Sequence, residues 1–173
     1  MEFNQLYFYT ASIANSKHLL KPDKYKDFII CCLQNLVFYT KIRVYAYVIM
    51  PNHIHFIWEL LELNGNESPD TSFIKYTSNE FSKDIKIYRP DEIHDYDFEL
   101  ETHEYTFWRK DPIIIDISNK NHIYKKVDYI HHNPVHGKWS LANKPSEYIY
   151  SSAQYYEEGI DKFGIITDIS ERL

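Results

Sequence analysis

The pattern of apolar and polar positions divides the 173 residues into short strand-like runs and longer helix-like stretches. Runs rich in β-branched and aromatic residues predict strands, and apolar residues three or four positions apart predict amphipathic helices. The predicted strands cover residues 6–13, 42–50, 53–61 and 107–116, the last containing a buried Ile113-Ile114-Ile115. The predicted helices cover residues 24–40, 70–87 and 120–133.

The order of these elements predicts the fold class. Only Pro51 and Asn52 separate the second and third strands, which indicates an antiparallel hairpin. The first six elements follow the β-α-β-β-α-β order of the ferredoxin-like fold. We therefore expect an α+β domain with helices on one face of an antiparallel sheet and the other face open to the third helix or a ligand. The candidate N-caps are Asp70, Thr71 or Ser72 for the second helix and Ser118 or Asn119 for the third.

The composition is that of one globular domain, with 44% apolar residues. No apolar run approaches the roughly 20 residues that span a bilayer, and the first residues lack the pattern of a secretory signal. We therefore expect a cytoplasmic protein without a membrane partner. The two cysteines, Cys31 and Cys32, are adjacent and cannot cross-link the fold. With 4 glycines and no G-x-x-x-x-G-K-[ST], a phosphate-binding loop of that kind is excluded.

The net charge of −6 argues against uniform binding to duplex DNA. The acids are unevenly placed, however, because residues 91–104 contain seven of the 25 acids and no Lys or Arg. The rest of the chain has nearly equal numbers of basic and acidic residues, so it can form a local basic groove. We expect the segment 88–104 to be a long loop or an irregular hairpin.

Two short patterns carry candidate chemistry. His53 and His55 are two positions apart in a predicted strand, so both imidazoles project from one face, as two ligands of a metal must. Tyr129 and Asn133 are four positions apart in a predicted helix and share one side of it. The alternatives are two unrelated strand histidines, and a helix end at which Pro134 forces Asn133 out of the α conformation.

Taken together, the two patterns predict phosphodiester chemistry. A phenol with an ordinary pKa of about 10 needs a nearby metal, positive charge or base before it attacks a phosphodiester. A divalent cation orients the phosphate and withdraws charge from it. Two imidazoles and one amide oxygen form a mixed ligand set, for which Mg²⁺ or Mn²⁺ is the expected ion and Zn²⁺ the alternative.

Residues 47–56 (YVIMPNHIHF) and 129–135 (YIHHNPV) resemble the two signatures of single-tyrosine HUH transposases, most closely the REP-associated tyrosine transposases. Trp108 and the Tyr150-Ser151-Ser152-Ala153 segment also fit that subgroup, and the resemblance runs from about residue 7 to 155. It implies a catalytic domain at 1–155, with an RRM-like core and an additional helix carrying the nucleophile, followed by a tail at 156–173.

The resemblance also implies the reaction and the roles of the site residues. Tyr129 matches the nucleophile that forms a 5′-phosphotyrosine, His53 and His55 match the metal ligands, and Asn133 matches the third ligand position, with His132 beside it as the alternative. The substrate is then single-stranded DNA recognised at hairpins. A monomer and a helix-swapped homodimer are both compatible with the resemblance.

Basic and aromatic residues near these signatures are candidates for DNA contact. Lys125, Lys126, Arg109 and Lys110 are predicted to contact phosphates, with solvated surface charge as the alternative. Aromatic residues of the hairpin can stack on bases, but we expect most of them to be packing: Tyr45, Tyr47, Phe56 and Trp58.

Two other functions remain open. A copy without nuclease activity would keep the platform and act as a hairpin-binding regulator. A zinc hydrolase would use His53, His55 and His132 around a bound hydroxide and would not need Tyr129.

Overall fold

The computed structural model describes residues 1–173. Four strands form an antiparallel sheet in the order β2-β3-β1-β6. They are β1 (Leu6–Ser12), β2 (Ile42–Ile49), β3 (His53–Leu60) and β6 (Ile113–Asp116). This is the strand order that the β-α-β-β-α-β topology produces, and the predicted β2–β3 hairpin is confirmed.

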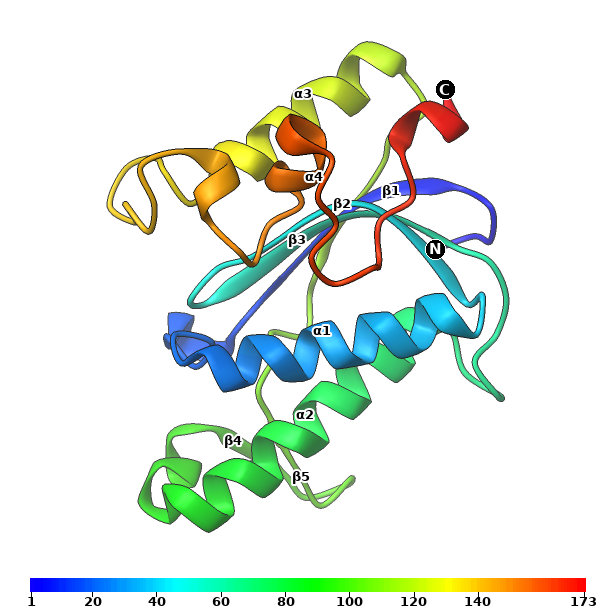
Figure 1. Cartoon of the computed structure of the whole chain (residues 1–173). Helices are drawn as coiled ribbons and strands as arrows, with labels where there is room; N and C mark the ends of the chain where they lie inside the picture. The colour runs from blue at the N-terminus through cyan, green and yellow to red at the C-terminus, as the bar shows by residue number, and fades with distance from the viewer.

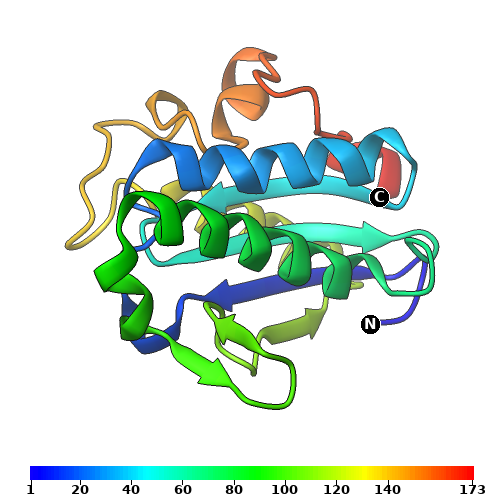
Figure 2. The same cartoon turned by 90° about the horizontal axis from the view of Figure 1, so that it is seen from below.

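Helices cover both faces of the sheet (Figure 1). Helices α1 (Asp23–Phe38) and α2 (Pro69–Tyr88) pack side by side on one face, in front of the strands in Figure 2. Helix α3 (Lys120–His132) lies on the other face with the short α4 (Ala153–Glu158). The third helix therefore occupies the face that the first two leave open, as the sequence suggested.

The alternation of side chains along the strands separates two hydrophobic cores. In β1, Tyr7 and Tyr9 point into a core of 29 buried residues against α1 and α2, whereas Leu6 and Phe8 point into a core of 12 on the α3 side. The β2–β3 register shifts near Tyr45, which joins the smaller core. All four candidate stacking residues of the hairpin are buried, so they are packing residues, as expected: Tyr45, Tyr47, Phe56 and Trp58.

The caps of the helices partly follow the sequence. The Asn119 side chain accepts from the backbone N–H groups of Asn121 and His122, which confirms it as the N-cap of α3. The cap of α2 was predicted wrongly, because the N-cap is Ser68 and the helix already begins at Pro69. A proline is favourable as the first helical residue because its φ angle is preset and its missing N–H has no partner there.

Strand β6 corrects a second prediction. It is an edge strand paired only with β1, and its isoleucines are 40–57% exposed instead of buried. A run of isoleucines favours a strand but does not reveal whether the strand has neighbours on both sides.

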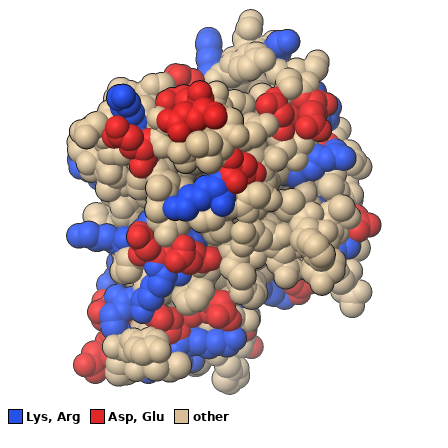
Figure 3. Space-filling model, in the orientation of Figure 1, with Lys and Arg blue, Asp and Glu red and all other residues tan.

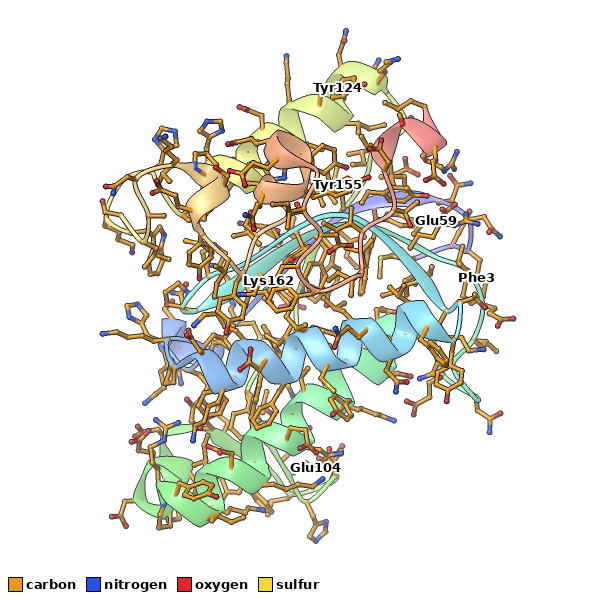
Figure 4. The ribbon with its side chains drawn as sticks, in the orientation of Figure 1. Phe3, Glu59, Glu104, Tyr124, Tyr155 and Lys162 are labelled. Atoms are coloured by element: carbon orange, nitrogen blue, oxygen red, sulfur yellow. The ribbon has the colours of Figure 1, made fainter.

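The acidic segment folds as an irregular hairpin beside α2, which agrees with one of its two predicted forms. A 3-10 helix η2 (Pro90–Asp95) leads into β4 (Asp97–Glu99) and β5 (Glu104–Thr106). Figure 4 shows Glu104 of this hairpin and Tyr124 of α3 on opposite sides of the sheet. Nearby cations pair with the acids, with Lys110 Nζ 2.5 Å from Glu99 and Lys17 Nζ 2.7 Å from Asp95.

Residues 156–173 pack against the same sheet. Ile165 belongs to the larger core and Ile169, in the 3-10 helix η4 (Ile169–Arg172), to the smaller one. The Thr167 backbone N–H donates to the Val44 carbonyl. Two further 3-10 turns complete the chain, η1 (Ala14–Ser16) and η3 (Pro145–Glu147). No helix has the length and apolar character needed to cross a membrane.

Candidate active site

His53 and His55 project from β3 on the α3 side of the sheet. The intervening Ile54 points into the larger core, so the period of two along the strand places both imidazoles together. Their ring centroids are 4.8 Å apart. The two histidines are therefore not independent surface residues.

Hydrogen bonds fix the orientation of both rings through Nδ1. His53 Nδ1 lies 2.7 Å from the Asn52 side-chain oxygen, which accepts the N–H and leaves the lone pair on Nε2. His55 Nδ1 lies 2.7 Å from Thr10 Oγ1, on the adjacent strand β1. His55 Nε2 is buried and has no hydrogen-bond partner. Because such a nitrogen is costly to leave unpaired, it indicates a position for a ligand.

Both histidines are neutral near pH 7. Burial is the main cause, and it lowers the pKa of His53 to about 4 and that of His55 to about 3. The Lys126 ammonium and the neighbouring His53 lower the pKa of His55 further. A neutral imidazole is the form that coordinates a cation, so no proton has to be displaced at neutral pH.

Helix α3 brings Tyr129 to the histidine pair. Ile123, Val127 and Ile130 bury one side of α3 in the smaller core. The Tyr129 ring lies 5.2 Å from the His55 ring, and 49% of its surface remains exposed. The phenol is therefore next to a buried imidazole and still open to a macromolecular substrate.

Asn133 follows Tyr129 by one turn and also faces the histidines. Its side chain lies close enough to His53 to favour the protonated imidazole, which raises the pKa of His53 against the larger effect of burial. Asn133 keeps α-helical angles, with φ −53° and ψ −45°. The alternative in which Pro134 forces this residue out of the α conformation is therefore wrong.

His132 is hydrogen-bonded within its own helix. Its Nδ1 lies 2.9 Å from the Asp128 carbonyl and 3.0 Å from the Asp128 carboxylate. The structure contains no group of three His, Cys, Asp or Glu side chains able to hold a metal. The ligand set of the zinc hydrolase, which combines His132 with the two strand histidines, is therefore not assembled.

A cleft of about 650 Å³ opens over the site between His53, the exposed side of α3 and the loop that follows it. Lys125 and Lys138 contribute positive charge, and Trp139 contributes a large aromatic surface. With Asp128 as the one carboxylate of the lining, the cleft has more basic than acidic side chains, although the protein as a whole is acidic. In Figure 3, basic and acidic side chains alternate over the visible face without a large area of one sign.

The four candidate phosphate contacts divide into two groups. Lys125 lines the cleft, and Lys126 Nζ lies 5.7 Å from the centre of the Tyr129 ring. Arg109 and Lys110 instead line a separate hollow beside the acidic hairpin, where Lys110 pairs with Glu99. The site thus assembles the two lysines of α3 but not the other pair.

Sequence patterns missed several residues that support the site. Thr10 and Asn52 orient the histidines, and buried His131 anchors α3 through Nε2, 2.9 Å from Ser152 Oγ. Ser152 Oγ in turn accepts from the Tyr47 backbone N–H of β2. These partners are far apart in sequence. Only Ser152 lies in a segment, Tyr150-Ser151-Ser152-Ala153, that resembles the transposase subgroup.

No family model and no curated protein matches the sequence. Among solved structures, a REP-associated tyrosine transposase bound to a REP hairpin superposes with a TM-score of 0.61 and 19% identity. The match covers 97% of this chain and 88% of the other. The chain has the fold of a tyrosine transposase. A candidate transposase of Deinococcus radiodurans R1 matches with 14% identity over 76% of this chain and 92% of the other, at a TM-score of 0.39 that is too low to add support.

The shared fold confirms the α+β, ferredoxin-like prediction. It also agrees with the resemblance that the two signatures indicated, because the similarity covers nearly the whole chain, including α3.

Proposed function

We propose that this protein is a metal-dependent transposase of the single-tyrosine HUH type, which cleaves and rejoins single-stranded DNA at or near hairpins. The observation that carries the proposal is the Tyr129 ring, 5.2 Å from an imidazole whose buried Nε2 has no partner. The candidate nucleophile of α3 and an imidazole nitrogen of β3 that has no partner thus lie on two elements that pack together. The known neighbour bound to a REP hairpin supports hairpin DNA as the substrate.

The residues present fit a divalent cation. His53 and His55 are neutral, each is hydrogen-bonded through Nδ1, and Nε2 of His55 has no protein partner. The Asn133 amide would supply the kind of oxygen ligand that Mg²⁺ and Mn²⁺ prefer. An ion held by these residues would withdraw charge from the scissile phosphate and would help to orient it for attack.

The protein residues then perform the exchange. Tyr129 Oη attacks phosphorus, the Oη–P bond forms and the P–O3′ bond breaks. The phenol gives up its proton, and the departing oxygen takes one up to become a 3′-OH. The DNA end remains on Tyr129 as a 5′-phosphotyrosine. The ammonium of Lys126 places positive charge beside the ring, where the anionic phosphate must approach.

Rejoining is the reverse of cleavage. A 3′-OH attacks the phosphotyrosine, restores the phosphodiester and releases Tyr129, so no external energy source is needed. His53, His55 and Tyr129 all come from one chain, which favours a monomer as the active unit over a helix-swapped dimer.

The test is covalent capture. Hairpin oligonucleotides from repeats flanking the gene, incubated with the protein and Mn²⁺, should give an adduct that survives denaturing electrophoresis. Tyr129→Phe should abolish the adduct. Tyr124→Phe is the matched control, because Tyr124 is another exposed tyrosine of α3 but lies outside the cleft.

Two outcomes would contradict the proposal. An adduct that persists in Tyr129→Phe would assign the nucleophile elsewhere. Tight hairpin binding with no adduct in any divalent cation would instead favour the regulator that has lost nuclease activity.

A further inference from the structure

We propose that Trp139 is a stacking platform for one base of the single-stranded DNA substrate, next to the nucleotide whose phosphate meets the histidines. This inference rests on the proposed function and adds the residue that holds the strand. The Trp139 ring lies 5.9 Å from the His53 ring and lines the cleft that also contains Tyr129.

The surroundings of the indole leave it available to a base. The His53 and His18 rings are tilted by 53° and 49° to it, at centroid distances of 5.9 and 5.5 Å, so neither stacks flat on it. Lys138 also lies near the indole, with its Nζ 5.2 Å from the ring centre. A long, exposed lysine side chain can move from the ring to a phosphate when a base arrives.

The indole is also anchored. Trp139 is half-buried and packs against the smaller core, so one part of the ring is fixed while another faces the cleft. A rigid aromatic surface loses little conformational entropy on binding, which is why aromatic side chains are effective contacts for unpaired bases.

The other aromatic residues do not offer this surface. Trp58 and Trp108 are 0% and 3% exposed, in the larger core. Among the residues lining the cleft, Tyr129 is the other large carbon ring, and its role is covalent. Trp139 is thus the aromatic platform that remains for a base in the cleft.

The chemistry around Trp139 fits a nucleotide and not an isolated phosphate or an apolar ligand. Lys125 and Lys138 provide positive charge for the DNA backbone, against the one carboxylate of Asp128, and in the proposed function His53 and Asn133 lie where the reacting phosphate would bind. Because every base has a π-face, stacking here adds affinity with little sequence preference. Recognition of a particular sequence would then depend on other contacts.

Intrinsic fluorescence provides a direct test, because the chain has three tryptophans and two of them are buried. Titration with the single strand dT12, in EDTA to prevent cleavage, should quench the emission of the native protein. A 12-nucleotide abasic strand carries the same phosphates but has nothing to stack and should not quench it. Equal quenching by both strands, or quenching by neither, would overturn the proposal.

Variants separate stacking from charge. Binding of dye-labelled dT12 should weaken about tenfold in Trp139→Leu, the loss expected for one stacked base, and should be nearly unchanged in Trp139→Phe. Lys138→Ala should weaken the binding of dT12 and of the abasic strand by the same factor. If Trp139→Leu weakens both strands equally, or if Trp139→Phe binds as weakly as Trp139→Leu, the indole has a structural role only.

Folding and activity are controlled separately. Unfolding temperatures identify a variant that fails to fold. The quenching experiment uses only the native protein, so it tests the stacking role even when a variant does not fold. An adduct on Tyr129 without quenching by dT12 would overturn the stacking role alone. Quenching without an adduct would overturn the transposase activity and leave the stacking role intact.

Discussion

Single hydrogen bonds decide which atoms of the site can react. Thr10 and Asn52 engage the Nδ1 atoms of the two histidines and leave both Nε2 atoms directed away from these partners. Partners of this kind fix the ring orientation of metal ligands and raise their basicity. The proposed ion therefore depends on residues that never touch it.

Replacement of Thr10 by valine tests this dependence. The change keeps the shape of the side chain but leaves His55 Nδ1 unpaired, and we expect the affinity for Mn²⁺ to fall about ten- to a hundredfold. The measurement is the Mn²⁺ concentration at half-maximal adduct formation. Thr77→Val is the matched control, because Thr77 is buried on the other side of the sheet and bonds to Trp108 Nε1. Unchanged Mn²⁺ dependence in Thr10→Val would show that Thr10 does not orient the ligand.

Buried histidines also make stability depend on pH. Burial lowers the pKa of His131 to about 4, below the ordinary value of about 6.5 that applies in the unfolded chain. Between these values the unfolded state binds more protons, so the unfolding free energy falls as the pH falls from 6.5 towards 4. For His131 the upper limit of this loss is about 2 kcal/mol at pH 5.

Urea unfolding in EDTA at pH 7 and pH 5 measures this effect. The native protein should lose stability, and His131→Gln should lose less than the native protein over the same interval. Equal losses in the two proteins would mean that His131 titrates normally in the fold.

At the scale of elements, the position of α3 determines whether Tyr129 meets the histidines. Its apolar residues bury one side of the helix, and the His131–Ser152–Tyr47 chain of hydrogen bonds fixes it to β2. Apolar packing alone tolerates small shifts of a helix, whereas a buried bond between defined atoms does not.

Ser152→Ala removes this link. We expect a stability loss of about 1–3 kcal/mol, since His131 Nε2 and the Tyr47 N–H lose their buried partner. The rate of single-turnover cleavage should fall by up to about a hundredfold while hairpin affinity changes little, because the nucleophile is displaced and the DNA contacts remain. Ser151→Ala is the matched control, since Ser151 is also buried but bonds to the Ala153 N–H. Equal cleavage rates in the two variants would remove the positioning role.

At the scale of the whole molecule, charge is divided between two sides of the sheet. The acidic hairpin lies on the α2 side and neutralises Lys110, whereas Lys125 and Lys126 of α3 are not paired with an acid. The net charge of −6 therefore does not describe the surface that DNA would meet.

The salt dependence of binding measures this division. Each phosphate contact to single-stranded DNA contributes a slope of about −0.7 to a plot of log affinity against log salt concentration. Lys125→Ala and Lys126→Ala should each reduce the slope by about that amount, and Lys110→Ala should leave it unchanged. A reduction in Lys110→Ala as large as in the α3 variants would place DNA on the hairpin side as well.

The sequence by itself determined the strands and helices and which side chains lie on the same side of one element. The periods of two and 3.6 predicted the strands and helices, placed His53 beside His55 and put Tyr129 on the same side of α3 as Asn133. These relations depend only on backbone geometry within one element, so a pattern of residue types is enough to reveal them.

The tertiary structure decided which of these local features meet. The packing of two cores on opposite faces of one sheet brings α3 to β3. It also brings Thr10 within hydrogen-bond distance of His55 and Trp139 next to His53, and it leaves β6 exposed at the edge. Residue types do not encode such contacts locally, because they depend on which surfaces are buried together when the whole chain folds.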